Sequence, residues 1–196
     1  LPIMREALTW VGHFQTQSRG TIGGSLCHLD PASEFPMVAL IYDAELQVAS
    51  VSGTRLIPMQ EWALAYMMPS IGPDELLTKI IIKPWQGAHG YGFQEFARRH
   101  GDFAIAAVGC LLKLDNNIIT DIALSIGGVE DVPRRFSECE DRLRGMTYDI
   151  EEIKTDVLEP LDQINYLDDS LVTGTYRRRL LKGLLIRAIE QAALRV

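Results

Sequence analysis

The sequence predicts an α+β protein in which helices cover one face of an antiparallel sheet. The second half holds four consecutive segments rich in Ile, Val and Phe, a composition typical of strands, at residues 76–84, 92–99, 103–115 and 117–129. The chain then closes on a long helix with an apolar stripe made of Leu181, Leu184, Leu185, Ala188 and Ala192. Strands followed by helices favour a layer of helices packed on one sheet face.

The composition excludes several classes of function. Hydrophobic residues make up 47% of 196 positions, which is enough for a sizeable core. The net charge of −7 opposes nucleic-acid binding, and no apolar run is long enough to span a membrane. The cysteines, Cys27, Cys110 and Cys139, are far apart, which indicates reduced thiols and a cytoplasmic location. The histidines fall in no metal-binding motif, so we predict no metal site.

The first part of the chain mixes short helices with one hairpin. Two alternating runs around Ser52–Gly53 predict the hairpin. Ser33 is a good N-cap because its hydroxyl can accept a backbone hydrogen bond. In chain order we expect a helix over residues 2–14, a loop over 16–30, a helix over 33–42, the hairpin over 44–58 and a helix over 59–67.

A turn from Pro69 to Pro73 predicts the boundary between two lobes. We therefore assign residues 1–72 to a first lobe and residues 73–196 to a second.

In the second lobe, the turn 115–117 (Asp-Asn-Asn) joins the last two strands as a hairpin. Helices follow over residues 134–144 and 150–158, and Gly145 is the C-terminal stop of the first. The basic run 177–179 starts the closing helix, where we expect a solvated face or a subunit contact.

The predicted loop before residue 30 contains two adjacent glycines, Gly23 and Gly24, between Thr21-Ile22 and Ser25. Glycine lacks a Cβ atom, so the backbone here can take left-handed torsions and approach a ligand closely. The exposed N–H groups and the two hydroxyls suit the oxygens of a phosphate group. A tight turn without a ligand stays open as the alternative, because no known nucleotide-binding spacing is present.

This turn stands within a longer series of motifs. The chain has VGH at residues 11–13, SRGTIGGS at 18–25, DPA at 30–32 and an acid at Glu34 before Pro36. Further along it has GTRLIP, DELLTKIIIKP, GFQEFARRHGDFAIAAVG, IALSIGGVEDVPRR and TYRRRLLKGLLIRAIEQA. The series resembles the medium, FAD-carrying subunit of molybdenum hydroxylases, the family of xanthine dehydrogenase and carbon monoxide dehydrogenase. The resemblance spans nearly the whole chain.

The resemblance implies a first lobe that is part of an FAD-binding fold of the vanillyl-alcohol-oxidase type. It also implies that Thr21, Ile22, Gly23, Gly24 and Ser25 line the FAD, with hydrogen bonds from backbone N–H groups and hydroxyls.

Three further positions match cofactor contacts of the family. Glu34 matches an acid that hydrogen-bonds the sugar-like part of FAD, although an acid is also favoured in a first helical turn by the helix dipole. Leu77 matches an apolar residue whose backbone lies near the flavin ring, and its alternative is an ordinary core leucine. Phe93 falls where some relatives place a Tyr against the flavin, and its alternative is sheet packing. No catalytic acid, base or nucleophile is predicted.

The resemblance further implies a function in electron transfer. FAD on this chain would receive electrons from an iron–sulfur [2Fe–2S] small subunit, which is served by a molybdopterin large subunit. An external acceptor, NAD or a quinone, would take the electrons from FAD. The alternative is a non-catalytic scaffold that has lost FAD and only mediates subunit assembly.

One feature of the family has no counterpart in these residues. The family carries another glycine-rich loop, of the AGGHS kind, on an N-terminal lobe. The sequence therefore resembles the C-terminal part of a medium subunit, and we expect this chain alone to bind FAD weakly.

Overall fold

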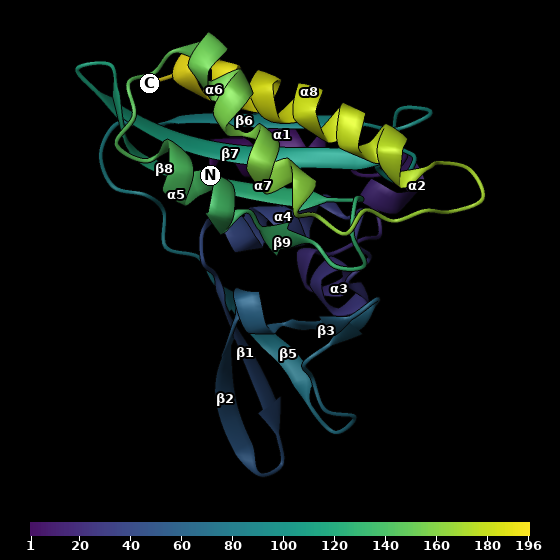
Figure 1. Ribbon diagram of the computed structural model, residues 1–196. Coiled ribbons are helices and arrows are strands. Elements are labelled where there is room, and N and C mark those ends of the chain that lie inside the picture. Colours follow the sequence, from purple (N-terminus) through teal and green to yellow (C-terminus); the bar gives the residue numbers. More distant parts are fainter.

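An antiparallel sheet forms the centre of the computed structural model, which describes residues 1–196 (Figure 1). Its order is β6-β7-β8-β9, made of Gly90–Phe96, Ala106–Asp115, Ile118–Gly127 and Arg134–Arg135. Asn116 and Asn117 join β7 to β8 with φ of 48° and 62°, as the predicted hairpin turn requires.

Both faces of this sheet are buried, and the side chains of β7 alternate between them. Val108 and Cys110 contribute to one apolar cluster, whereas Ala107 and Leu111 contribute to another on the opposite face. Burial on both faces explains why the strand sequence is almost continuously apolar.

The C-terminal helices cover one face. They are α5 (Ser137–Leu143), α6 (Ile150–Asp156), α7 (Leu158–Asp162) and α8 (Gly174–Ala193). The predicted stripe of α8 is buried in the cluster of that face, which confirms it. A Cβ atom at Gly92 would lie 2.3 Å from the carbonyl oxygen of Ala188, so only glycine permits α8 to approach β6 this closely.

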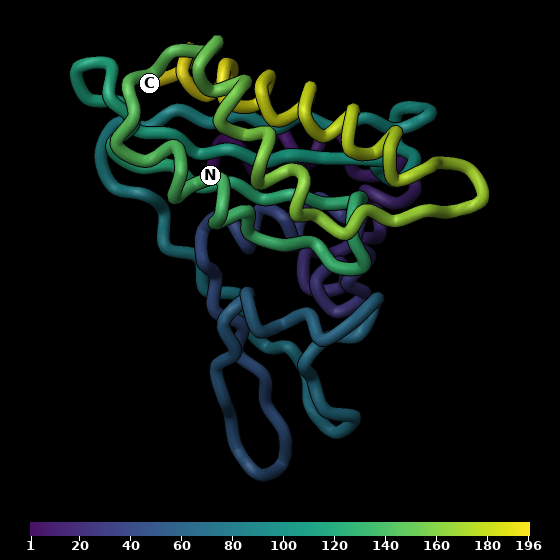
Figure 2. Tube along the Cα trace, viewed as in Figure 1, coloured from purple at the N-terminus to yellow at the C-terminus, as the bar shows by residue number.

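The helices that follow the strands all lie on this one face, and the opposite face is covered by helices from the first part of the chain. Helices α1 (Pro2–Leu8) and α4 (Glu34–Ile41) from the first part of the chain pack against the other face. In Figure 2 the early part of the chain lies on the opposite side of the sheet from the yellow C-terminal helix. The sheet therefore has helices on both sides, and α4 brings the first lobe into contact with the second.

A smaller sheet, of order β2-β1-β5, extends below this assembly (Figure 1). Its strands are Glu45–Ser50 (β1), Gly53–Pro58 (β2) and Leu76–Ile81 (β5). The hairpin of β1 and β2 is confirmed, with its turn at Val51–Ser52 because Ser50 pairs with Gly53. β5 was expected in the second lobe, but it pairs with β1 of the first. This pairing places the change of lobe after β5, beyond the predicted division at residue 72.

The predicted helix over 59–67 is also wrong. Only Met59–Glu61 is helical (η1), and a small hairpin of β3 (Ala63–Ala65) and β4 (Met68–Pro69) follows. The chain turns back here instead: Met67 has a φ of +50°, outside the right-handed helical region, and the carbonyl oxygen of Trp62 accepts the N–H of Ser70 at 2.7 Å. The buried Trp62 also donates its indole N–H to the carbonyl oxygen of Leu26 at 2.7 Å, which attaches this segment to the first part of the chain.

Two predicted helices of the second lobe begin or end elsewhere. Arg134–Arg135 pairs with Ser125–Ile126 as a strand, so α5 begins only at Ser137. The helix predicted over 150–158 ends at Asp156 and gives way to α7. Pro160 lacks an N–H and would clash with the carbonyl group four residues earlier, which prevents one continuous helix.

The segment before α4 differs from the predicted helix and loop. The first helix ends at Leu8 because the chain reverses at Gly12, where φ is +50°. Two short helices follow, α2 (Phe14–Gln17) and α3 (Ile22–His28), the latter inside the predicted loop. No helix of the protein combines the length and the apolar character needed to cross a membrane.

Candidate functional site

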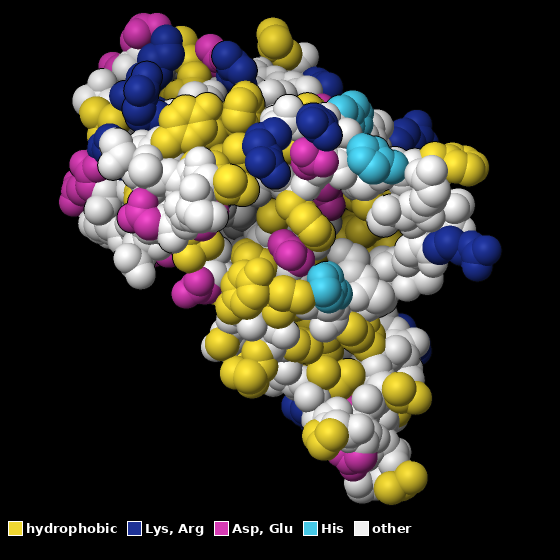
Figure 3. Space-filling view, turned by 90° about the vertical axis from the view of Figure 1, so that its right-hand side faces the viewer, with side chains coloured by type: hydrophobic (Ala, Val, Ile, Leu, Met, Phe, Trp, Pro, Cys, Tyr) yellow, Lys and Arg dark blue, Asp and Glu magenta, His cyan; other side chains and the backbone are white.

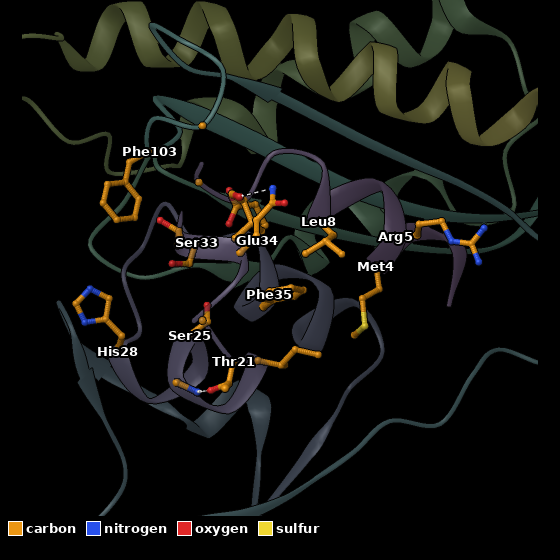
Figure 4. A pocket seen from close by; sticks show the side chains of 18 of the residues that line it. Met4, Arg5, Leu8, Thr21, Ser25, His28, Ser33, Glu34, Phe35 and Phe103 are labelled. Atoms are coloured by element: carbon orange, nitrogen blue, oxygen red, sulfur yellow. Dashed lines mark hydrogen bonds between the residues drawn. The ribbon is translucent and has the colours of Figure 1, made fainter. Parts of the chain in front are cut away.

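A cavity of about 780 Å³ lies between α1, α3, the start of α4 and the segment after β6 (Figure 4). Its volume is within the range of cofactor-binding pockets. Phe103 and His28 lie at one end of it and Met4 and Arg5 at the other. In the space-filling view, hydrophobic side chains with acidic ones among them occupy the face between the upper layer and the lower lobe (Figure 3).

The Thr21–Ser25 turn forms one wall of the cavity as the first turn of α3. Thr21 is the N-cap, and its Oγ1 accepts a hydrogen bond from the N–H of Gly24 at 2.9 Å. Ile22 and Gly23 are the first two helical residues, so their N–H groups have no partner within the helix. This wall therefore combines free backbone donors with the hydroxyl of Ser25.

The glycines serve a different purpose from the predicted one. Neither Gly23 nor Gly24 has a positive φ, so the prediction of left-handed torsions here is wrong. A Cβ atom at Gly24 would lie 3.0 Å from Thr21 Oγ1, which would crowd the capping hydrogen bond. A Cβ atom at Gly23 would meet only Leu77 Cδ2, at 3.9 Å. No protein atom therefore requires a glycine at position 23.

Glu34 and Ser33 lie opposite, at the N-terminus of α4 (Figure 4). Ser33 occupies the N-cap position as predicted, but its hydroxyl makes no capping bond. Glu34 is 7% exposed, and burial raises the pKa of its carboxyl to about 7, with a further contribution from the charge of Asp30. The wall opposite α3 thus carries a buried acid without a cation.

Two glycine turns from distant parts of the sequence meet at the rim. Gly101 has a φ of +87°, and a Cβ atom there would lie 2.8 Å from the carbonyl oxygen of Gly12. Both residues line the cavity. The contact places the segment after β6 beside the end of α1, so the second lobe contributes to the site.

The structure brings five of the eight predicted cofactor residues together. Thr21, Ile22, Gly24, Ser25 and Glu34 line the cavity.

The other three predicted residues lie outside the lining. Gly23 faces Leu77, which packs beside the apolar cluster of the smaller lobe. Phe93 is 1% exposed and packs between the sheet and the helices α1 and α4. As flavin contacts, these three residues stay predictions.

Sequence reasoning missed the wall that α1, α2 and the segment after β6 supply. Its residues include Met4, Arg5, Leu8, Gln17, Gly101 and Asp102. The sequence of α1 contained a sign of this wall: Leu8 is apolar but 44% exposed, while Ile3 and Ala7 on the same helix are fully buried. Apolar residues on two sides of so short a helix indicate a second covered face.

Comparisons with known protein families agree with this geometry. Residues 1–85 match the FAD binding domain in molybdopterin dehydrogenase, and residues 91–192 match the C-terminal domain of the CO dehydrogenase flavoprotein. The second match alone covers more than half of the chain. This protein belongs to the FAD-binding medium subunits of the molybdenum hydroxylases. The resemblance noted in the sequence is thereby confirmed.

Individual relatives of this flavoprotein subunit support the same conclusion. The chain is 33% identical to the nicotine 6-hydroxylase medium subunit of Paenarthrobacter nicotinovorans, over all of this chain and 68% of that protein. It is also 33% identical to caffeine dehydrogenase subunit beta of a Pseudomonas species, over all of this chain and 67% of that protein. The chain spans about two thirds of the length of these relatives.

A solved structure shows the same fold. Reconstituted CO dehydrogenase from Oligotropha carboxidovorans superposes with a TM-score of 0.95 at 25% identity, over all of this chain and 68% of that one. The mixture of helices with antiparallel sheets is therefore that of a CO dehydrogenase flavoprotein. The two family matches meet between residues 85 and 91, which agrees with the assignment of β5 to the first lobe.

Proposed function

We propose that this chain holds FAD as the electron-transfer subunit of a molybdopterin-dependent dehydrogenase. The observation that carries the proposal is the cavity at the Thr21–Ser25 turn, within the part of the chain that matches an FAD-binding domain. When bound, FAD supplies redox chemistry, and the protein supplies binding, orientation and electrostatics.

The two walls of the cavity suit different parts of this cofactor. The free N–H group of Ile22, with the hydroxyls of Thr21 and Ser25, supplies donors for phosphate oxygens. Glu34 is an acceptor for hydroxyl groups of the sugar-like chain. Leu77 supports the α3 wall from behind, next to Gly23. The buried Phe93 lies deeper, where it fixes the sheet beneath the site.

Electrons reach this subunit, in our proposal, from an iron–sulfur small subunit that is served by a molybdopterin large subunit. They leave to NAD or a quinone, in a complex located in the cytoplasm.

The first experiment measures whether FAD binds. The purified chain is titrated with FAD, and binding is followed by quenching of flavin fluorescence. We expect saturable binding that Ser25→Ala weakens, since a hydroxyl donor is lost. Ser137→Ala, which changes a serine far from the cavity, serves as the matched control. Absence of binding at any FAD concentration would favour the scaffold without a cofactor.

The second experiment tests the electron route. The chain is co-expressed with candidate iron–sulfur and molybdopterin subunits and the complex is isolated. Substrate added without air should bleach the flavin absorbance only when all three subunits are present. NAD and a quinone analogue are then compared for their ability to restore the oxidised spectrum.

A further inference from the structure

A second buried acid, Glu95, lies behind the cavity on β6. It is 6% exposed, and neither of its carboxyl oxygens has a hydrogen-bond partner. Leaving a carboxylate buried and unpartnered is costly, so the group needs a proton or a polar partner. The proposed electron-transfer function does not use this residue.

The strand register places Glu95 in the same row of the sheet as the position on β8 that the segment before α4 covers. Glu95 pairs with Ala107 and Ala107 with Gly127, so the three side-chain positions adjoin on one sheet face. The Pro31 carbonyl oxygen lies 2.9 Å from the Cβ position of Gly127 and accepts the N–H of Gly128 at 2.8 Å. The segment that leads into Glu34 therefore crosses this row.

Both carboxyls have a raised proton affinity, and the charge of Glu34 adds to that of Glu95. Burial raises the pKa of Glu95 to about 8, and the charge of Glu34 contributes to that increase. The pKa of Glu34 is itself raised to about 7, chiefly by burial. Two buried carboxyls of this kind do not both ionise readily at neutral pH.

No cation neutralises the pair. The charged or titratable groups on the surrounding elements include Arg5 and Glu6 on α1, His28 on α3, Asp30 before α4, Arg98, Arg99, His100 and Asp102 after β6, Lys113 on β7, Glu190 on α8 and Arg195 after it. Glu6 is paired with Arg195, and Lys113 with Asp121. None of the basic groups forms an ion pair or hydrogen bond with Glu34 or Glu95.

We propose that Glu34 and Glu95 hold one proton between them at neutral pH, and that this pair couples the binding of a phosphate-bearing ligand in the cavity to uptake of a proton. The coupling rests on the proposed function, in which that ligand is FAD. Glu34 lines the cavity, whereas Glu95 acts through it as a positioning residue.

The sign of the coupling follows from charge. Loss of the shared proton adds a negative charge beside a ligand that carries negative phosphates, so binding weakens as the pH rises. Linkage is reciprocal: a ligand that binds the protonated pair more tightly must also raise the proton affinity of the pair. We expect the affinity for FAD to fall about tenfold from about pH 6.5 to about pH 9, a change typical of coupled sites.

The first test needs no ligand. A protonated carboxylic acid gives an infrared band that is distinct from that of a carboxylate and shifts in heavy water. We expect this band at neutral pH in the ligand-free chain and a weaker band in Glu95→Gln, since Glu34 stays partly protonated by its own burial. Absence of the band in the wild-type chain at neutral pH would overturn the proposed pair, whether or not the variant folds.

The second test measures the coupling. FAD is titrated into the chain by calorimetry near pH 7.5, in two buffers with different ionisation enthalpies. We expect up to about one proton to be taken up per FAD in the wild type, and much less in Glu95→Gln. Asp131→Asn removes an exposed charge outside the cavity and is the matched control, which should retain the proton uptake.

The outcomes separate this proposal from the proposed function. If FAD does not bind at any pH, the proposed function fails, and the infrared band still decides whether the pair holds a proton. If FAD binds without proton uptake while the band is present, the coupling is refuted and the function stands.

Discussion

Arg177, on the first turn of α8, is expected to contribute strongly to the stability of the fold. Its side chain is buried and donates to the carbonyl oxygens of Ile105 at 2.7 Å, Gly128 at 2.5 Å and Leu167 at 3.2 Å, and it also pairs with Asp169. Ile105 precedes β7 and Gly128 follows β8, so this side chain joins the closing helix to two strand ends. Its predicted location on a solvated face is therefore wrong.

Replacement of Arg177 by Leu removes every one of these donors at once. A buried carbonyl group left without a donor costs about 1–3 kcal/mol. Burial of the apolar leucine side chain offsets part of this free-energy cost, so we expect the free energy of unfolding to fall by about 3–5 kcal/mol. For a protein of this size that lowers the midpoint of thermal unfolding by about 10 °C.

The neighbouring Arg178 provides a control on the same helix. It pairs with Asp162 at the surface, where its side chain is 39% exposed. Arg178→Leu should cost less than about 1 kcal/mol. Urea unfolding followed by circular dichroism measures both variants. If Arg177→Leu unfolds within about 1 kcal/mol of the wild type, the three carbonyl groups are satisfied by other donors and the argument from buried hydrogen bonds fails.

Three further predictions concern the site and the core. Gly24→Val should weaken FAD binding at least about tenfold, because it adds a side chain to the cavity wall against Thr21 Oγ1. Leu184→Ala should instead lower the free energy of unfolding by about 2–5 kcal/mol and leave the FAD affinity of the folded fraction unchanged. The pKa of Glu95 is about 8 in the folded protein, against an ordinary value of 4.5, so the burial of this carboxyl destabilises the protein increasingly as the pH rises from 4.5 to 8. In urea titrations, Glu95→Gln should therefore match the wild type near pH 4.5 and be more stable by a few kcal/mol near pH 9. Trp62→Phe leaves the carbonyl oxygen of Leu26 without its donor and should cost about 1–3 kcal/mol, and a cost near zero would show that this hydrogen bond does not hold the segment.

Patterns confined to neighbouring residues predicted much of the fold. The two asparagines between β7 and β8 take left-handed torsions, which their short polar side chains tolerate, so the hairpin was correct. The apolar stripe of α8 was also correct, since helical periodicity identifies its buried face. In both cases the residues that determine the structure are close in sequence.

The failures share a non-local cause. Residues 76–81 have the composition of a strand, but nothing within them says that their partner is β1 rather than β6. The helical pattern over residues 59–67 contains no sign of the pairing of β3 with β4, nor of the contact between Trp62 and Leu26, 36 positions away. The burial of Arg177 depends on carbonyl groups supplied by three separate segments. Local propensity carries no information about such partners.

The site was predicted to a similar extent. The motif located the Thr21–Ser25 wall and Glu34, and both lie on the cavity. The reason given for the glycines was wrong, since the short helix α3 needs no left-handed residue within it. The burial of Glu95 could not be predicted from the sequence, because an acid in an alternating strand is equally compatible with an exposed position. The burial of Glu95 comes from tertiary packing, in which α1 covers β6 and α4 covers the neighbouring β7.

The two walls of the cavity differ in their polar groups, and this difference favours one orientation of a bound ligand. Free N–H groups and hydroxyls lie on the α3 side, and buried carboxyls lie at and behind the start of α4. A ligand with phosphate at one part and hydroxyl groups at another gains hydrogen bonds in one orientation. In the reverse orientation its phosphate would face Glu34, and the repulsion would grow as the carboxyl pair loses its proton. The same acids that make binding depend on pH therefore also select the orientation of the ligand, and Glu95→Gln should weaken both effects together.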